Sequence, residues 1–573
     1  MSTLSRDTAS VAEQMIVDAC AAGAVADFAD EGPVDLDEAG AAARWGIDRL
    51  VRGEFLLDLL TRQDGERLHP RGVRVRGARI DGSCVWDWQD LQTPLELIDC
   101  VLDGPLVLDC ARLTGLTLRN CRLPRITGRE LRASHGLDLT GSCIPGGVDL
   151  TEAQITGSFR APHARLGSPD AAHDALSADG VHVTGDVFLG GGFTATGEVR
   201  LFGAHIGGDL SCSEGAFSNP GGTALSADRA EVTGGVFLRQ GFTATGEVRL
   251  LGAHISGDLS CSGGTFRNPE GDALFAEGLE VAGGVFLRRG FTATGEVRLP
   301  GAHVGGTLAC EGGRFDAGSG CALDLEGASI TGSLRWRELA APARGGLDLT
   351  RATVGELSDD AAAWPAPGML QLTGFTYARI ADAAPRSTRQ RLDWIRRQPT
   401  YSPQPYQQLA AVYRQAGQLD EARDIAVARR DDLRSRGDLT RPERAWNRFL
   451  GLSIGHGYHP ERAAWALVAL FILTAIPIWI GARNDAFVQV GNSPNPAVTS
   501  SHCDTGYPCL NWPAYALEDI TPIINLHEAE NWQPDRSRAW GWALRDWLDL
   551  ATILGWVGTT LLIAALTGLA RVD

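Results

Sequence analysis

Histidine and glutamate recur along the middle of the chain at steps that alternate between 23 and 26 residues. In chain order the series is His182, His205, Glu231, His254, Glu280 and His303. If its members occupy equivalent places in successive turns of a repeating fold, neighbours lie about 5 Å apart. Imidazole and carboxylate groups at that distance can pair through their charges or hold a metal ion weakly. A solvated, charge-compensated face multiplied by duplication is the alternative interpretation.

A second series is aromatic. Phe188, Phe237 and Phe286 are spaced by 49 residues and alternate with Ser211 and Ser260. Apolar residues flank each phenylalanine, so if those point inward the rings point outward. An outward aromatic stripe indicates a partner surface or the contact of a covering helix or loop. The predicted partner surface combines two groups of residues: Phe188, Phe237 and Phe286 with His205, His254, His303, Glu231 and Glu280.

Charged pairs form a third series with the same spacing. Its arginines are Arg200, Arg249 and Arg298, and a glutamate (Glu198, Glu247, Glu296) precedes each by two residues. A salt-bridged face is the expected role of this series.

The 12 cysteines include no C-x-x-C pair, so the usual sequence support for redox dithiols and zinc ribbons is missing. Cys212, Cys261 and Cys310 repeat every two turns, which separates them by about 9–10 Å, beyond the roughly 7 Å Cα limit of a disulfide. Cys100 and Cys121 are expected to be buried. Cys503 and Cys509 are a candidate disulfide, with two free surface thiols as the alternative.

The sequence lacks the motifs of several common enzyme classes. The sequence contains no lysine, which excludes Walker A loops and Schiff-base lysines. It contains no G-x-G-x-x-G after a strand, no H-E-x-x-H and no G-x-S-x-G. No catalytic, cofactor-binding or metal-ligating residue can be named, and the cofactor is unknown. The formal charge of −18 argues against general nucleic-acid binding.

The elements that position these series are short strands. From about Val73, apolar or small residues come as i, i+2 pairs that recur every five or six residues, which predicts four short faces per turn of 21 or 22 residues. The phrase FTATGEVRL occurs at 193–201, 242–250 and 291–299, so the 49-residue repeat is two turns plus about five inserted residues near 218–224 and 267–273. We therefore expect a mainly β protein, a quadrilateral β-helix over 69–358 with double-turn repeats at about 188–310.

The A-x-I/L-x-G units at 78–82, 111–115, 153–157 and 328–332 resemble the pentapeptide repeat. That resemblance implies a right-handed quadrilateral β-helix, although the six-residue faces and the insertions depart from the pattern. The whole chain also resembles bacterial membrane proteins often labelled "membrane-associated oxidoreductase", through VRGEFLLDLL (51–60), the G-A-x-I-x-G turns, PQPYQQLAAVYRQAG (403–417) and its apolar tail. No cofactor motif supports that label.

Helical patterns flank the β-helix. An N-terminal helical cap is expected over 1–68, with helices at 8–29 and 38–62, and a linker and cap over 359–400. Residues 401–436 resemble one tetratricopeptide repeat, or form a plain helical hairpin. A membrane domain follows over 437–573, with spans at 463–482 and 548–570. Residues 515–526 are apolar enough to lie on the membrane surface.

The arginine distribution predicts orientation. Nine arginines lie between Arg423 and Arg462, whereas the loop 483–544 holds few. The positive-inside rule then places both termini and the β-helix in the cytoplasm, and the loop outside, in the plasma (inner) membrane. Acidic residues interrupt the first 30 residues, so no signal-peptide core is expected.

These patterns favour a membrane-anchored scaffold or sensor whose β-helix binds a protein, since solenoids offer extended surfaces and few pockets. An oxidoreductase, as the family label suggests, is the alternative. A DNA-mimicking topoisomerase binder is a weaker one, because the columns mix His, Arg, Phe and Ser with the acids.

Overall fold

The computed structural model describes residues 9–29, 45–61, 69–169, 173–382, 384, 387–484, 486–490, 508–521, 523–537 and 540–567. The chain divides into two compact units, Met1–Pro399 and Thr400–Asp573. The first unit is built around strands and the second around helices, and each is described by itself.

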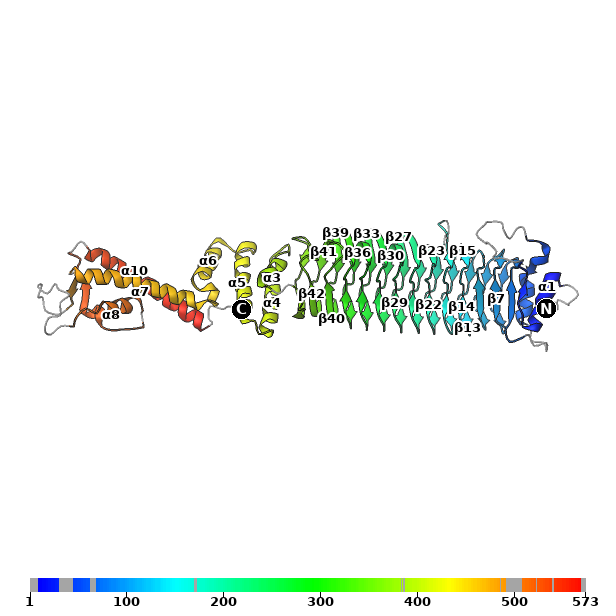
Figure 1. Cartoon of the computed structure of the whole chain (residues 1–573), viewed down its shortest axis with the longest axis horizontal. Helices are drawn as coiled ribbons and strands as arrows, with labels where there is room; N and C mark the ends of the chain where they lie inside the picture. Colours follow the sequence, from blue (N-terminus) through cyan, green and yellow to red (C-terminus); the bar gives the residue numbers. More distant parts are fainter. Residues whose placement is uncertain are drawn as a thin grey trace. The chain divides into compact units, whose positions relative to one another are not determined.

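The first unit is a parallel β-solenoid of about 13 turns, which confirms the expected mainly β fold. In its first complete turn the strands β3 (Val73–Arg76), β4 (Arg79–Asp81), β5 (Cys84–Val85) and β6 (Asp90–Leu91) follow one another. The next strand, β7 (Leu95–Ile98), then pairs in parallel with β3. Four columns of short strands result, and Figure 1 shows successive turns stacking along one axis.

Inward-facing side chains fill the solenoid. Along each short strand the apolar residues at alternate positions are buried, as the period of two requires. Aromatic rings form a continuous internal ladder, with neighbouring centroids 4.9 to 5.3 Å apart. Its members are Phe193, Phe217, Phe242, Phe266, Phe291, Phe315 and Trp336. The phenylalanine that begins each FTATGEVRL phrase is therefore a core residue.

The inserted residues of the 49-residue repeat lie where the sequence places them. Strand β27 (Ala216–Ser226) pairs with β30 (Thr243–Arg249), and the register shifts between Ser218 and Thr223. Strand β33 (Thr265–Phe275) contains the same shift. Residues 216–218 of β27 pair with β23 (Thr194–Thr196) and residues 225–226 pair with β24 (Val199–Arg200), so the extra residues bulge out between two columns of strands and the pairing on either side is kept.

Short N-terminal segments complete the first turn. Helix α1 (Val11–Ala22) is followed by β1 (Ala26–Asp27), which pairs with β3. Strand β2 (Leu50–Arg52) pairs with β4, and α2 (Gly53–Thr61) follows it. Backbone groups at the open end of the sheet thereby gain hydrogen-bond partners.

Two expected N-terminal helices are shorter than their apolar patterns suggested. Residues 26–27 and 50–52 are strands, and Ile47–Arg49 is a 3₁₀ turn. Pairing with the exposed edge of the first turn satisfies these backbone groups and outweighs their helical propensity. Residues 30–44 lie outside the described part of the chain.

The solenoid continues beyond the expected boundary at 358. Strand β42 (Thr353–Asp359) is followed by β43 (Leu370–Gln371) and β44 (Thr376–Ile380), both of which pair with the preceding turn. Helix α3 (Thr388–Ile395) then ends the unit. Much of the segment expected to be linker and cap (359–400) therefore belongs to a solenoid turn.

Trp364 explains why the composition of this segment was misleading. Although its neighbours are mostly proline and alanine, the side chain is buried and its Nε1 donates to Asp359 Oδ2 at 2.7 Å. Arg391 on α3 binds the same carboxylate. The Pro- and Ala-rich stretch thus packs onto the end of the solenoid.

The second unit begins with a pair of helices inside the expected range 401–436. Helix α4 (Gln404–Gln415) and helix α5 (Leu419–Arg436) are joined by three residues. Tyr406 Oη donates to Asp432 Oδ2 at 2.8 Å and links the two helices. Helix α6 (Arg441–Ile454) and a 3₁₀ turn follow.

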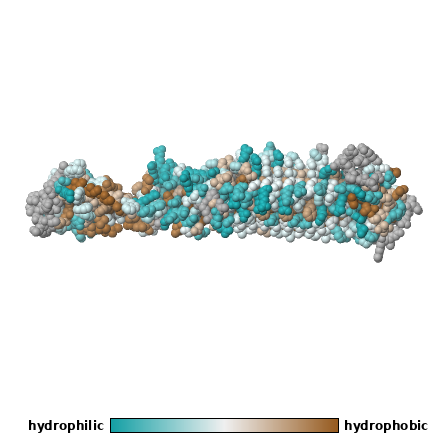
Figure 2. All heavy atoms as spheres, viewed as in Figure 1, coloured by the Kyte–Doolittle hydropathy of each residue, from teal (hydrophilic) through white to brown (hydrophobic). Residues whose placement is uncertain are grey.

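Two longer helices, α7 (Pro460–Arg483) and α10 (Gly541–Leu566), are long and apolar enough to cross a membrane. They include most of the spans expected from the sequence. Both expose large apolar side chains, and Figure 2 shows hydrophobic surface over the helical unit. The exposed side chains include Trp465, Val468, Ile472, Leu473 and Ile476 on α7, and Leu550, Ile553, Leu554, Trp556 and Val557 on α10.

The segment between these helices packs against them. Strands β45 (Phe487–Gln489) and β46 (Trp532–Pro534) pair antiparallel, and α9 (Glu528–Asn531) directly precedes β46. Helix α8 (Trp512–Ile520) shares a buried apolar cluster with α7 and α10. The first half of the segment expected on a membrane surface (515–526) is thus a helix seated on α7 and α10.

Candidate functional site

The register places the histidine and glutamate series in one column. Each member is the Cα partner of the next across parallel strands, from His182 to His303. His182 and His205 stack with ring centroids 4.3 Å apart. His205 Nε2 lies 3.3 Å from Glu231 Oε2, and the equivalent His254–Glu280 distance is 3.2 Å.

This column consists of two short, largely exposed groups, His182–His205–Glu231 and His254–Glu280. Within the described ranges, no three His, Cys, Asp or Glu side chains converge in a way that could hold a metal ion. Exposed pairs of this kind contribute little to stability, about 0–1 kcal/mol each. The arrangement matches a charge-compensated face better than a metal site.

The aromatic stripe also follows the register. Phe188 and Phe237 flank Ser211, and Phe237 and Phe286 flank Ser260, in adjacent parallel turns. The rings lie on the outer side of the solenoid but are half-buried, and Ser260 between two of them is only 7% exposed. The rings of Phe237 and Phe286 fold back over Gly235 and Gly284, where a Cβ would lie 2.7 Å from the tip of each ring.

Each ring of the stripe lies beneath a guanidinium group. The Cζ atoms of Arg239 and Arg288 are 4.3 Å from the ring centroids of Phe237 and Phe286. Arg160, from the neighbouring turn, lies 5.0 Å from the Phe188 centroid. The groups that cover the rings are thus cations on the solenoid itself. We call these three phenylalanines and three arginines the Phe–Arg stripe.

The arginines of the stripe differ in pairing from many others on the solenoid. Arg74, Arg129 and Arg249, for example, bind carboxylates of neighbouring turns at 2.6 to 2.9 Å. Within the described ranges, Arg160, Arg239 and Arg288 make no ion pair and no side-chain hydrogen bond, and Nε of Arg239 and of Arg288 is buried without a partner. Stacked guanidinium groups with free N–H donors are suited to bind carboxylates.

The third series is a salt-bridged face, with different partners from those expected. Arg249 binds Asp228 at 2.8 Å and Arg298 binds Asp324 at 3.2 Å, whereas Arg298 and Glu296 are 4.0 Å apart. Arg200 pairs with Asp174 and Asp179. Burial raises the pKa of Glu198 and Glu247. Aspartates of adjacent turns, rather than the glutamates two residues away, therefore neutralise these arginines.

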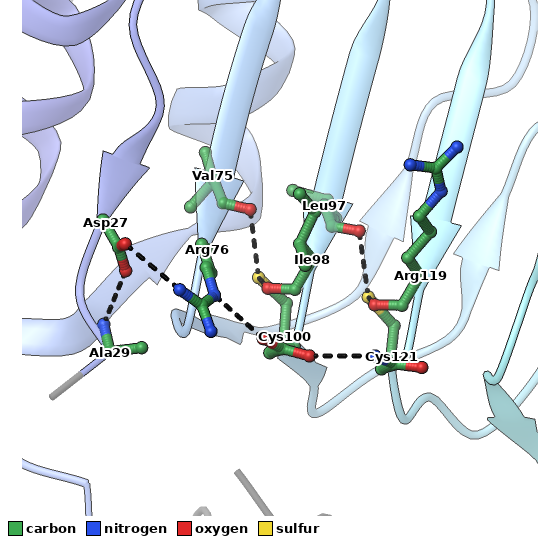
Figure 3. A network of polar contacts seen from close by, with 11 residues as sticks. Asp27, Ala29, Val75, Arg76, Leu97, Ile98, Cys100, Arg119 and Cys121 are labelled. Carbon is green, nitrogen blue, oxygen red and sulfur yellow. Dashed lines mark hydrogen bonds and ion pairs between the residues drawn. The ribbon is translucent and has the colours of Figure 1, made fainter. Parts of the chain in front are cut away.

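Most cysteines of the solenoid are core residues: Cys84, Cys100, Cys121, Cys212, Cys261 and Cys310 are buried, whereas Cys110, Cys143 and Cys321 are partly exposed. Cys100 Sγ and Cys121 Sγ lie 3.2 to 3.7 Å from backbone carbonyl oxygens of neighbouring strands (Figure 3). Burial raises the pKa of Cys121, Cys212, Cys261 and Cys310 well above that of a free thiol. Because the thiolate is the nucleophile, these buried thiols are poor nucleophiles.

The predicted Cys503–Cys509 disulfide falls partly outside the described residues, since Cys503 is not among them. Cys509 itself is disulfide-bonded. The pairing of these two cysteines stays a prediction.

Sequence reasoning missed the arginines of the stripe. Arg239 and Arg288 each follow their phenylalanine by two residues, so a signal was present in the 49-residue repeat. Arg160 lies outside that repeat and meets Phe188 only through the register. Comparison of the chain with protein-family models, with curated proteins and with solved structures found no match.

Proposed function

We propose that this chain is a membrane-anchored scaffold or sensor whose solenoid binds an acidic protein partner through the Phe–Arg stripe. The observation that carries the proposal is the set of three guanidinium groups, each stacked on an outward phenylalanine and without a carboxylate partner in the described ranges. The chain as a whole has a formal charge of −18. A row of cations on such a chain favours binding to a surface that bears carboxylates, because opposite charges then face each other across the interface.

The spacing of the stripe describes what the partner must present. Successive rings are two turns apart, which is about 9.6 Å for strands spaced by about 4.8 Å. A partner that engages more than one arginine needs carboxylates at a similar spacing and apolar groups that rest on the rings. Aromatic and arginine side chains are enriched where interfaces gain most of their affinity.

Membrane anchoring rests on α7 and α10, whose exposed apolar side chains suit a lipid environment. The nine arginines from Arg423 to Arg462 support a cytoplasmic position for the solenoid and both termini under the positive-inside rule. The segment between α7 and α10 then faces outside the plasma (inner) membrane. A disulfide-bonded Cys509 in that segment fits an oxidising compartment.

The test compares partners captured by the full-length, detergent-solubilised chain and its variants from the cells that express it. The double variant Arg239→Ala/Arg288→Ala removes two cations of the stripe. The double variant Phe237→Ser/Phe286→Ser replaces two rings with serine, the residue that stands at the equivalent place in the alternate turns. Arg229→Ala is the matched control, because Arg229 stacks on Phe202 outside the stripe with Cζ 5.7 Å from the ring centroid.

We expect a protein that binds the wild type and Arg229→Ala, but not either stripe variant, and whose binding weakens with salt. If the stripe variants capture the same proteins as the wild type, the stripe is not the interface and the proposal fails.

A further inference from the structure

The α4–α5 helix pair contains a cavity of about 610 Å³ that the proposed function does not use. Small side chains open it: Ala410 on α4, and Ala422 and Ala426 on α5. Its volume falls within the range of small-molecule pockets, about 300–1,000 Å³. The hollows beside Glu96 and beside His254 on the solenoid are smaller and shallower.

Arginines line this cavity. Arg414 and Arg423 are exposed at its rim, and Arg429 forms part of its wall. Arg423 pairs with Asp420 at 2.9 Å, and Arg414 Nε donates to the Ala410 carbonyl oxygen at 3.3 Å, which leaves its terminal nitrogens for other partners. Three cations around one hollow create a positive potential within it.

Arg429 is the unusual member of this set. Only 8% of the residue is exposed, yet its side chain makes no ion pair or hydrogen bond within the described ranges. Its backbone carbonyl accepts from Tyr401 Oη at 3.2 Å, so the residue is well fixed. A buried charge is costly unless a counter-charge neutralises it.

A comparison within the chain shows how such a charge is normally satisfied. Arg391, the other buried arginine of the described residues, binds both oxygens of Asp359 at 2.7 and 2.8 Å. Arg429 lacks the equivalent carboxylate and lines a cavity instead. The nearby Asp432 already accepts a hydrogen bond from Tyr406.

We infer that the cavity binds a phosphate group, with Arg429 as its buried counter-charge and Arg414 and Arg423 at its rim. A phosphate carries three or four oxygens and up to two charges, so it can engage several guanidinium groups at once, whereas a carboxylate has only two oxygens. Arginine binds phosphate through paired, nearly parallel N–H donors. The cavity is larger than the phosphate itself and leaves room for the group that bears it.

The phosphate has two possible sources. Tyr458 lines the cavity and precedes by two residues the start of α7 at Pro460. If α7 crosses the membrane, the cavity lies beside the lipid headgroups, and an anionic phospholipid supplies the phosphate. The alternative source is a small phosphorylated molecule in the cytoplasm.

The experiment uses the purified full-length chain in two arms. In the lipid arm, nanodiscs of phosphatidylcholine are compared with nanodiscs that also contain phosphatidic acid. In the soluble arm, inorganic phosphate is titrated against the chain in phosphatidylcholine nanodiscs. Each arm measures the hydrogen-exchange protection of α4–α5 as a function of phosphate or phosphatidic acid concentration. The chains compared are the wild type, Arg429→Gln, Arg414→Gln and Arg448→Gln. Arg448 is exposed on α6 and does not line the cavity, so it is the matched control.

We expect phosphate to protect α4–α5 in the wild type and Arg448→Gln, with apparent affinity at least tenfold weaker in Arg429→Gln and weaker by a smaller factor in Arg414→Gln. Protection by phosphatidic acid alone identifies the lipid source, and protection by inorganic phosphate identifies the soluble one. Absence of protection in both arms, or equal protection of all variants, overturns the inference.

The unliganded variants provide a second measurement. Since Arg429→Gln removes a buried charge that has no protein partner, we expect the unliganded helix pair to be at least as stable as in the wild type. A marked loss of protection in unliganded Arg429→Gln contradicts this, because it shows that Arg429 has a structural role in the folded chain.

Discussion

Arg391 and Asp359 form a buried, two-bonded ion pair between α3 and the last strands of the solenoid. The two N–O distances are 2.8 and 2.7 Å, and the side chains are 0% and 3% exposed. Trp364 Nε1 also donates a hydrogen bond to the same carboxylate, at 2.7 Å. One aspartate thus holds the closing helix and the Pro- and Ala-rich segment against the solenoid.

Removing one partner of this pair should loosen that end of the solenoid. Arg391→Ala leaves a buried, unpaired carboxylate, which costs about 3–5 kcal/mol. We expect hydrogen exchange to accelerate in residues 370–395 of the full-length variant. Arg379→Ala is the control, because Arg379 pairs with Glu356 at 2.6 Å while its side chain is 74% exposed. An exposed pair contributes about 0.2–1 kcal/mol, so equal effects of the two variants would contradict the argument.

Inner and outer phenylalanines should respond differently to truncation. Phe266 lies in the internal ladder between Phe242 and Phe291 and has no exposed surface, so Phe266→Ala should destabilise its turns by about 3–5 kcal/mol. Phe286 is half-buried under Arg288, and Phe286→Ser should cost about 1 kcal/mol. Hydrogen-exchange protection of residues 242–291 measures both, and a similar loss for the two variants would show that the outer ring is also a core residue.

The sequence predicts the solenoid because its apolar pairs repeat with the period that a strand imposes on its two faces. Each pair fixes an inward direction, so Phe188, Phe237 and Phe286 could be placed outside. The positions of Arg160 over Phe188 and of Arg429 against the α4–α5 cavity could not be predicted, since each depends on side-chain conformations and on neighbours from other turns or helices. The end of the solenoid was misplaced because proline and alanine indicate a linker, whereas the burial of Trp364 follows from its tertiary contact with Asp359.

Gly555 fixes the seating of α8 on α10. A Cβ at Gly555 would lie 2.1 Å from the carbonyl oxygen of Ile520, the last residue of α8. Gly555→Ala should therefore displace α8, because backbone atoms cannot move aside alone. At Gly558 a Cβ would meet the flexible end of Leu467 at 2.8 Å, so Gly558→Ala should be tolerated. Limited proteolysis between residues 508 and 530 in detergent distinguishes the two, and equal cleavage would contradict the close packing at Gly555.

Asp519, one residue before the end of α8, should make the stability of this packing depend on pH. The pKa of Asp519 is raised to about 7, mainly by burial and further by the negative charges of Asp549 and Glu518. A hydrogen bond from Thr552 Oγ1 at 3.1 Å acts in the opposite direction and lowers the pKa. Its Oδ2 is buried without a hydrogen-bond partner in the described residues.

The direction of this dependence follows from the raised pKa. An aspartate in the unfolded chain titrates near pH 4, so the folded state binds the proton more tightly. The packing of α8 is then most stable at or below about pH 4, loses stability as the pH rises from about 4 to about 7, and changes little above that. Asp519→Asn, which stays neutral, should remove this fall, while Asp546→Asn on the exposed side of α10 should retain it. The measurement is hydrogen-exchange protection of α8 between pH 5 and 8, corrected for intrinsic exchange. The argument fails if protection in the wild type and in Asp519→Asn declines in parallel.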